Sequence, residues 1–252
     1  MTTTVGHWID NKEVPSTSGR TAPVYDPALG VETKRVALAN GAEIDAAIAA
    51  AKKAFPGWSK TSLAGRQQII FKFRELLNAK KGELAEIITS EHGKVLSDAL
   101  GEITRGQEVV EFAVGMPQLI KGYYSENVST GVDVYSTRQA LGVVGIISPF
   151  NFPAMVPMWF FPIAIAAGNT VVLKPSDTTP ASTVWMAKVM SEFLPAGVFN
   201  VVCGERETGR SVVEHKRPDM VSITGSVGAG IQVAQSAATQ LKRVHLELGG
   251  KA

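Results

Sequence analysis

The second half of the chain alternates between short apolar runs and longer segments with helical periodicity. The five apolar runs lie at 143–147, 170–173, 199–202, 220–223 and 243–248. The helical segments between them lie at 154–167, 181–193, 208–214 and 228–241. Short β-branched runs joined by long crossovers are typical of parallel strands that are buried on both faces. The pattern therefore predicts an α/β fold with a doubly wound parallel sheet.

The first half of the chain follows a different pattern. Residues 1–36 contain short β-like runs around a turn at Asp10–Lys12. Three segments whose apolar residues recur at spacings of three and four lie at 42–55, 62–91 and about 95–120. Pro56 predicts the end of the first helix, and Gly82 predicts a break or kink in the second. We expect a helical layer that packs against the sheet.

Residues 121–139 predict a long β-hairpin. Aromatic and β-branched residues, such as Tyr124 and Val134, surround a polar turn at 127–131. A hairpin of this length between a helical layer and a sheet leaves strand edges that need a cover. We hypothesise that it pairs with a partner subunit or with a further segment of polypeptide.

Composition places the chain among globular proteins with enough apolar residues for a large core. It has 252 residues, of which 45% are hydrophobic and 19% charged. The net charge of +2 is spread without a basic block, so the charge pattern indicates no binding of nucleic acid. The most apolar stretch, 155–167, contains prolines and is too short to cross a bilayer, so we expect no membrane association.

The numbers and positions of cysteines and histidines bear on disulfides, on the cellular compartment and on metal binding. The single cysteine, Cys203, excludes an intrachain disulfide and is typical of a reducing compartment. The start, MTTTVGHWID, lacks the basic and apolar regions of a signal peptide, so we expect a cytoplasmic protein. The four histidines are scattered without ligand spacing, so we expect no metal site.

The strand at 143–147 is followed by a stiff polar turn, Ser148-Pro149-Phe150-Asn151-Phe152-Pro153. Pro149 cannot extend a hydrogen-bonded strand, and Pro153 can open the next helix. Asn151 thus lies at the carboxyl end of a buried strand, where open α/β sheets bind ligands. Its amide can donate to a developing oxyanion, or it only satisfies the turn.

The next strand is followed by Lys174-Pro175-Ser176-Asp177. A lysine and a carboxylate at this position suit a nucleotide. The carboxylate can accept hydrogen bonds from ribose hydroxyls, and the lysine can bind the ribose or a nearby phosphate. The alternative is that Ser176 or Asp177 caps the following helix.

The last two strands are also followed by small residues. Gly225-Ser226 precedes a helix whose first N–H groups can bind a pyrophosphate, although the glycine spacing does not match G-x-G-x-x-G. A tight turn without a ligand is the alternative. Glu247, before Leu248-Gly249-Gly250, can be a general base or form only a surface ion pair. Cys203 is predicted to be a core residue rather than a nucleophile.

Taken together, these motifs resemble the NAD(P)-dependent aldehyde dehydrogenase superfamily over the whole chain. Pro149–Pro153 resembles the family's oxyanion-asparagine motif, and Lys174–Asp177 resembles its adenosine-ribose motif, which usually ends in glutamate. Gly225-Ser226 is similar to its pyrophosphate turn, and Glu247–Lys251 to its general-base motif.

The resemblance implies roles for individual residues. Asn151 and Glu247 would be catalytic, and the cofactor would be NAD, with NADP as an alternative. Asp177 would favour NAD, because a carboxylate repels a 2′-phosphate. The implied cofactor-binding residues are Ile147, Ser148, Pro149, Phe150, Lys174, Ser176, Asp177, Thr178, Gly204, Gly225, Ser226, Leu248 and Gly249.

The resemblance also implies a Rossmann-like organisation of the chain. Residues 1–120 would form the N-terminal β start and helical layer of the cofactor domain. Residues 121–140 would form a protruding oligomerisation hairpin, and residues 141–252 the dinucleotide-binding α/β domain. The catalytic domain would lie outside this chain, and the complete enzyme would be a homo-oligomer, a dimer or a tetramer.

Two subfamilies are resembled in different segments. Residues 121–176 resemble methylmalonate-semialdehyde dehydrogenases, whereas residues 194–252 look more like aminobutyraldehyde or succinate-semialdehyde dehydrogenases. The first group uses coenzyme A and typically lacks a glutamate at the position of Glu247. Hydrolysis and acyl transfer to coenzyme A therefore both remain open.

The implied reaction oxidises a small (semi)aldehyde to an acid or an acyl-CoA through a cysteine thioester. The family's nucleophilic cysteine lies downstream of Glu247–Lys251, so we expect this chain alone to be inactive. One alternative is a non-catalytic nucleotide-binding or assembly module. An unrelated Rossmann dehydrogenase is the other, and the lack of G-x-G-x-x-G and of Tyr-x-x-x-Lys in the second half argues against it.

Overall fold

A seven-stranded sheet forms the centre of the protein, in a computed structural model that describes residues 3–251. The strand order is β12-β11-β8-β9-β10-β2-β3, and the first five strands are mutually parallel. They are β8 (Val143–Ile147), β9 (Thr170–Lys174), β10 (Phe199–Val201), β11 (Met220–Gly225) and β12 (Arg243–Leu248). The predicted doubly wound parallel sheet is confirmed. Its strand order reverses between β8 and β11, which is where such sheets bind ligands.

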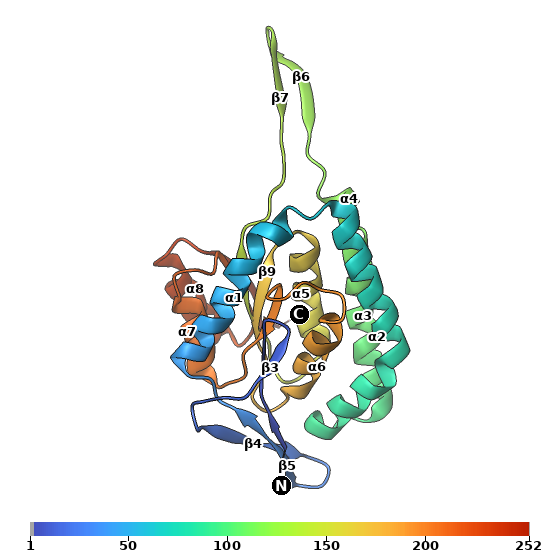
Figure 1. Ribbon diagram of the computed structural model, residues 1–252, viewed down its shortest axis with the longest axis vertical. Coiled ribbons are helices and arrows are strands. Elements are labelled where there is room, and N and C mark those ends of the chain that lie inside the picture. The colour runs from blue at the N-terminus through green and yellow to red at the C-terminus, as the bar shows by residue number, and fades with distance from the viewer. Residues whose placement is uncertain (1–2, 252) are drawn as a thin grey trace.

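Helices cover both faces of this sheet (Figure 1). One face carries α1 (Gly41–Ser59), α7 (Arg206–Glu214) and α8 (Val227–Ala238). The other face carries α5 (Met155–Ala166) and α6 (Ala181–Met190), which are covered by α2 (Leu63–His92) and α3 (Leu96–Val114). The two coats explain the apolar runs of the sequence, because a strand such as β9 is buried at every position.

Aromatic side chains connect the helical layer to the sheet. Phe161 of α5 stacks on Phe199 of β10, with ring centroids 4.6 Å apart. Phe73 of α2 meets the same Phe161 edge to face at 5.6 Å. All three side chains are fully buried, so the two outer helices and the sheet share one hydrophobic core.

The N-terminal strands extend the sheet, which the sequence pattern did not predict. β2 (His7–Ile9) pairs antiparallel with β10, and β3 (Lys12–Val14) pairs with β2. A separate sheet contains β1 (Thr3–Val5), β5 (Val31–Ala37) and β4 (Thr21–Asp26). His7 is fully buried and its Nδ1 accepts a hydrogen bond from the Cys203 backbone N–H at 3.0 Å. The first strands are thereby tied to the carboxyl edge of the parallel sheet.

Two predicted helix boundaries are wrong. α1 continues through Pro56 to Ser59, because Trp58 is buried and its Nε1 donates to the Ile165 carbonyl at 3.0 Å. Pro56 cannot donate a hydrogen bond within the last turn of α1, and the anchor at Trp58 outweighs that loss. α2 runs unbroken past Gly82, which is exposed and packs against nothing. The third predicted helix divides into α3 and a short α4 (Met116–Leu119).

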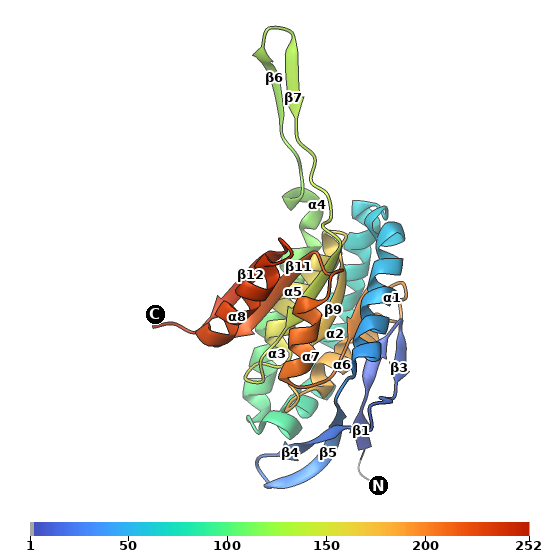
Figure 2. The same cartoon turned by 90° about the vertical axis from the view of Figure 1, so that its left-hand side faces the viewer.

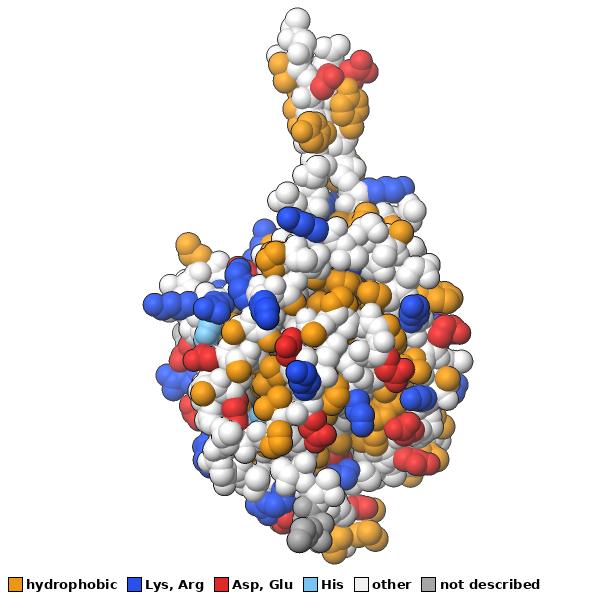
Figure 3. Space-filling view, viewed as in Figure 1, with side chains coloured by type: hydrophobic (Ala, Val, Ile, Leu, Met, Phe, Trp, Pro, Cys, Tyr) orange, Lys and Arg blue, Asp and Glu red, His pale blue; other side chains and the backbone are white. Residues whose placement is uncertain are grey.

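The predicted hairpin is confirmed and stands clear of the body (Figures 1 and 2). Its strands are β6 (Tyr124–Ser129) and β7 (Val132–Tyr135), and every residue of both is exposed. The turn is shorter than the predicted one, because β6 extends to Ser129. Figure 3 shows hydrophobic side chains on the hairpin, and Tyr135 is 74% exposed.

Candidate functional site

The sequence-predicted residues gather at the carboxyl edge of the parallel strands. Ile147 and Lys174 are register partners at the ends of β8 and β9. Gly225 and Leu248 are register partners at the ends of β11 and β12. Because parallel strands end at the same edge of a sheet, motifs far apart in the sequence come to one side of the molecule.

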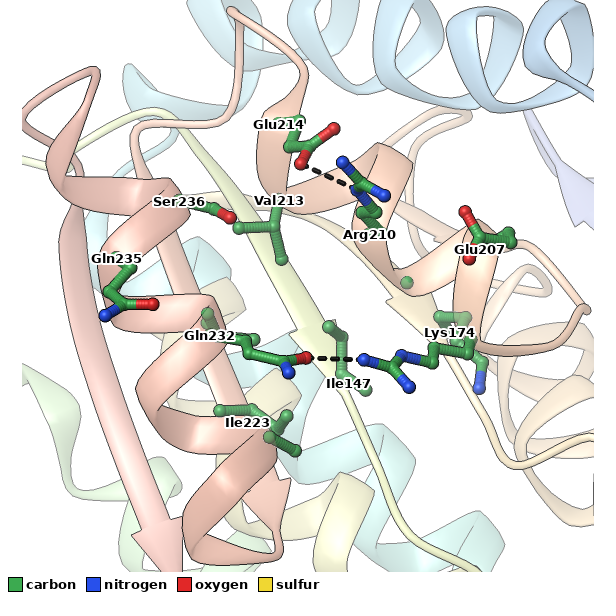
Figure 4. Close-up of a pocket in the computed structure, with 14 residues that line it drawn as sticks. Ile147, Lys174, Glu207, Arg210, Val213, Glu214, Ile223, Gln232, Gln235 and Ser236 are labelled. Carbon is green, nitrogen blue, oxygen red and sulfur yellow. Dashed lines mark hydrogen bonds and ion pairs between the residues drawn. The ribbon is translucent and has the colours of Figure 1, made fainter.

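A cavity of about 460 Å³ opens at this edge between α7 and α8 (Figure 4). Ile147, Lys174 and Ile223 line its floor, and side chains of the two helices line its walls. Val213 and Val233 make part of the walls apolar. A slot of this size with few polar groups is typical of a small-molecule or cofactor site.

Lys174 is the cation of this cavity that has no partner. The residue as a whole is 7% exposed, its Nζ makes no hydrogen bond to residues 3–251, and the ammonium itself is open to the cavity. Burial lowers the pKa of Lys174, and the carboxylates of Asp177 and Glu205 oppose that shift. An ammonium that opens into a cavity without a hydrogen bond from the protein fits a ligand that supplies oxygen atoms.

Side chains of α7 and α8 meet across the opening of the cavity. Arg206 Nη2 donates to Gln232 Oε1 at 2.7 Å, which links the two helices. Arg210 is paired with Glu214 at 2.8 Å on the rim, as Figure 4 shows. Sequence reasoning missed these residues, because they lie within helices and carry no motif.

The segment after β9 does not cap a helix. Ser176 Oγ shares a hydrogen bond with Thr178 Oγ1 at 2.9 Å, and α6 begins later, after Pro180, with no side-chain cap. The capping alternative for Ser176 and Asp177 is therefore wrong. Asp177 is half-buried and its charge acts on Lys174, so the predicted ribose pair of lysine and carboxylate is brought together.

The turns after β10 and β11 open α7 and α8. Gly204 has φ +157°, and a Cβ there would overlap the Thr208 side chain, so this turn requires glycine. Ser226 is the N-cap of α8, and its hydroxyl accepts from the Ala229 N–H at 3.2 Å. Among residues 3–251, the buried hydroxyls of Ser148 and Thr224 at this edge have no hydrogen-bond partner.

Asn151 faces a second cavity, of about 550 Å³. The cavity is lined by His92, Lys94, Ser97, Asp98, Gly101, Arg105, Asn151 and Phe152. The side chain of Asn151 is exposed, and the backbone carbonyl of Asn151 accepts a hydrogen bond from Lys94 Nζ at 2.9 Å. Of the preceding turn residues, Pro149 is half-buried and Phe150 is exposed. The lining from the end of α2, the α2–α3 connection and α3 was not predicted, because nothing in the local sequence places it beside Asn151.

Glu247 is not brought into either cavity. It is exposed on β12, and its Oε1 lies 3.3 Å from His245 Nε2 on the same face of the strand. Leu248 packs instead on Gly230 of α8, and Gly249 follows the end of the strand. β12 is the edge strand of the sheet, so among the described residues no strand pairs with its outer edge (Figure 2).

Cys203 is fully buried at the end of β10, and the prediction that it is a core residue is confirmed. Its Sγ lies 3.3 Å from the Gly6 carbonyl oxygen, and burial raises the pKa of its thiol to about 12. A thiol in this state is a poor nucleophile.

Across residues 3–251, no group of His, Cys, Asp or Glu side chains has an arrangement that could hold a metal ion. No helix in the described part of the chain has the length and apolarity to span a bilayer.

Comparison with known proteins identifies similar sequences and folds. Residues 14–252 match the aldehyde dehydrogenase family. A malonate-semialdehyde dehydrogenase of Pseudomonas aeruginosa is 42% identical over 97% of this chain and 49% of its own length. The chain thus spans about half the length of the curated relatives it matches.

Solved structures give the same result. A methylmalonate-semialdehyde dehydrogenase of Oceanimonas doudoroffii is 42% identical with a TM-score of 0.96, over 100% of this chain and 51% of that one. An aldehyde dehydrogenase of Pseudomonas syringae, solved with NAD+ and octanal, is 38% identical with a TM-score of 0.91, over 98% of this chain and 50% of that one.

Proposed function

Because this chain belongs to the aldehyde dehydrogenase family, we propose that it provides the NAD-binding domain of an enzyme that oxidises a semialdehyde. The observation that carries the proposal is Lys174, a largely buried residue whose ammonium opens into the cavity between α7 and α8 without a hydrogen bond to the protein. The resemblance noted in the sequence and the NAD+ complex of the relative from Pseudomonas syringae support this assignment.

We propose that the strand-end residues divide the cofactor between them. Lys174 and Asp177 bind the ribose, and the apolar slot between α7 and α8 takes a flat ring. The Gly225-Ser226 turn and the first N–H groups of α8 bind the pyrophosphate. The bound nicotinamide supplies the acceptor for the hydride of the aldehyde. Asp177 favours NAD over NADP, because its carboxylate repels a 2′-phosphate.

We propose two catalytic roles for residues of this chain. The Asn151 amide donates a hydrogen bond to the oxyanion that forms when a cysteine thiolate attacks the aldehyde. Glu247 takes a proton from the water that hydrolyses the resulting thioester, unless coenzyme A accepts the acyl group instead. Cys203 is buried with a raised pKa, so the thiolate has to come from elsewhere in the complete protein.

We propose a carboxylate-bearing aldehyde as the substrate. Arg105 lines the same cavity as Asn151, is exposed, and pairs with no acidic side chain of residues 3–251. A guanidinium there can bind a carboxylate through two hydrogen bonds. The names of the relatives, which include malonate-semialdehyde and methylmalonate-semialdehyde dehydrogenases, agree with this choice.

We also propose that the β6–β7 hairpin packs against a second subunit. It exposes Tyr124, Val128, Val134 and Tyr135 by half or more of their surface. A projecting apolar ribbon of this kind is typical of an assembly contact. A monodisperse monomer with an ordered hairpin would contradict this part of the proposal.

The experiment is a calorimetric titration of the purified chain with NAD, combined with an NADH assay on an aldehyde. Binding without turnover supports a cofactor domain that lacks its nucleophile. Turnover would contradict the assignment of the nucleophile to another part of the protein. Absence of NAD binding would reject the proposed cofactor site and leave only an assembly role.

A further inference from the structure

We propose that Glu102 and Lys94 are positioning residues for Asn151. They hold the backbone of Asn151 in place and thereby set the point and direction from which its side-chain amide projects. The inference rests on the proposed role of Asn151 as an oxyanion donor. Asn151 has no side-chain hydrogen bond to any described residue, so its own amide group is not what fixes its direction. Its orientation therefore depends on how firmly the segment 151–155 is held.

Glu102 of α3 holds the end of this segment. The residue is 1% exposed, and its Oε1 accepts hydrogen bonds from the N–H groups of Ala154 at 2.8 Å and Met155 at 3.1 Å. These amides belong to the start of α5, where N–H groups have no partner within the helix. A carboxylate there also interacts favourably with the helix dipole.

Lys94 holds the beginning of the segment. Its Nζ donates to Glu102 Oε2 at 2.6 Å and to the Asn151 carbonyl at 2.9 Å. It also lies 4.4 Å from the centre of the Phe152 ring. The ammonium of Lys94 therefore has three contacts, with a carboxylate, a backbone carbonyl and an aromatic ring, and Glu102 balances its charge. One buried ion pair thus fixes both the carbonyl of Asn151 and the first amides of α5.

Two glycines allow this arrangement. Gly93 ends α2 in the left-handed conformation with φ +82°, which turns the chain so that Lys94 follows at the mouth of the second cavity. Gly106 lies one turn after Glu102, and a Cβ there would overlap Met158 Cε of α5. The missing side chain lets α3 approach α5 closely enough for Glu102 to reach its first amides.

The chemical consequence is a preorganised oxyanion donor. A donor accelerates a reaction only when it already points to where charge will develop. A displacement of about 1 Å can cost about 10²-fold in rate, so a loose Asn151 would lose most of its contribution. Glu102 and Lys94 act through Asn151 and are positioning residues.

The test uses the 252-residue chain and nuclear magnetic resonance. In Glu102→Gln and Lys94→Gln, we expect amide deuterium exchange at Ala154 and Met155 to be about 10-fold faster or more. The backbone amide of Asn151 should become more mobile on the nanosecond timescale, because the contacts of Lys94 and Glu102 hold the backbone of this segment. Lys94→Arg should restore both properties, since a guanidinium can pair with Glu102 and donate to the carbonyl.

The matched control is Arg74→Gln, which removes a different ion pair to α3, that of Arg74 on α2 with Glu111 at 2.9 Å. It should leave exchange and Asn151 unchanged. Unchanged exchange and an equally rigid Asn151 backbone in both Glu102→Gln and Lys94→Gln would overturn the inference. NAD titration of the same samples separates the two proposals, because loss of NAD binding in the unmodified chain affects only the proposed function.

Discussion

Replacing Lys174 with methionine is expected to weaken NAD binding without weakening the fold. Methionine has a similar length and fills the same space, but it carries no charge and no donor. Lys174 is 7% exposed, and burial lowers its pKa, so its charge is held there at a cost to the free protein. A lysine kept for the fold would instead donate to a buried acceptor, whereas Lys174 Nζ makes no hydrogen bond to residues 3–251.

The size of the effect follows from the lost hydrogen bonds. Hydrogen bonds from a charged donor contribute about 1.5–3 kcal/mol, so the dissociation constant of NAD should rise roughly 10- to 150-fold. Calorimetry measures that constant, and urea denaturation measures the free energy of unfolding, which should stay equal or increase. Lys188→Met is the control, because Lys188 is exposed on α6 and does not line the cavity. An unchanged dissociation constant, or a loss of stability in Lys174→Met alone, would refute the reasoning.

Three further changes test the fold that carries the site. Gly204→Ala should destabilise the protein by about 2–4 kcal/mol in urea denaturation, because φ is +157° and the new Cβ overlaps Thr208. An unchanged denaturation midpoint would contradict the turn geometry. Trp58→Phe should lower the free energy of unfolding by about 1–2 kcal/mol, measured by the same method, because the hydrogen bond to the Ile165 carbonyl is lost. Equal stability of the two proteins would show that this anchor is not needed. Burial lowers the pKa of His7, so the unfolded chain takes up the proton first, and stability present above about pH 6.5 is lost as the pH falls below it. The loss attributable to this residue should reach at most about 1.4 kcal/mol per pH unit and should disappear in His7→Gln, while equal pH slopes of the two proteins would exclude His7 as the cause.

The parallel half of the fold could be predicted because its signals are local. Strands buried on both faces must be apolar throughout, and the turns between them must be small or rigid, so 143–147 and 170–173 are recognisable without a partner. The ends of these strands must then lie at one edge. That geometry is enough to place Ile147, Lys174 and Gly225 together before any contact is known.

The remaining features depend on contacts between distant segments. The continuation of α1 past Pro56 is decided by Trp58 and the Ile165 carbonyl, which are 107 positions apart. Likewise, nothing in the sequences of the short strands β2 and β10 indicates that they pair with each other. Lys94 and Arg105 join Asn151 only because α3 packs on α5 through Gly106, and a search for motifs at strand ends does not examine helices.

The most direct test of the central claim is to map NAD onto the chain by amide chemical shifts. The account predicts that NAD perturbs Gly209, Gln232 and Ser226, which surround the cavity between α7 and α8 or open α8, in the same titration steps as Lys174. The amides of the β6–β7 hairpin should not move. Saturation of the chain with NAD while the cavity residues keep their shifts, or perturbations confined to another surface, would contradict the account.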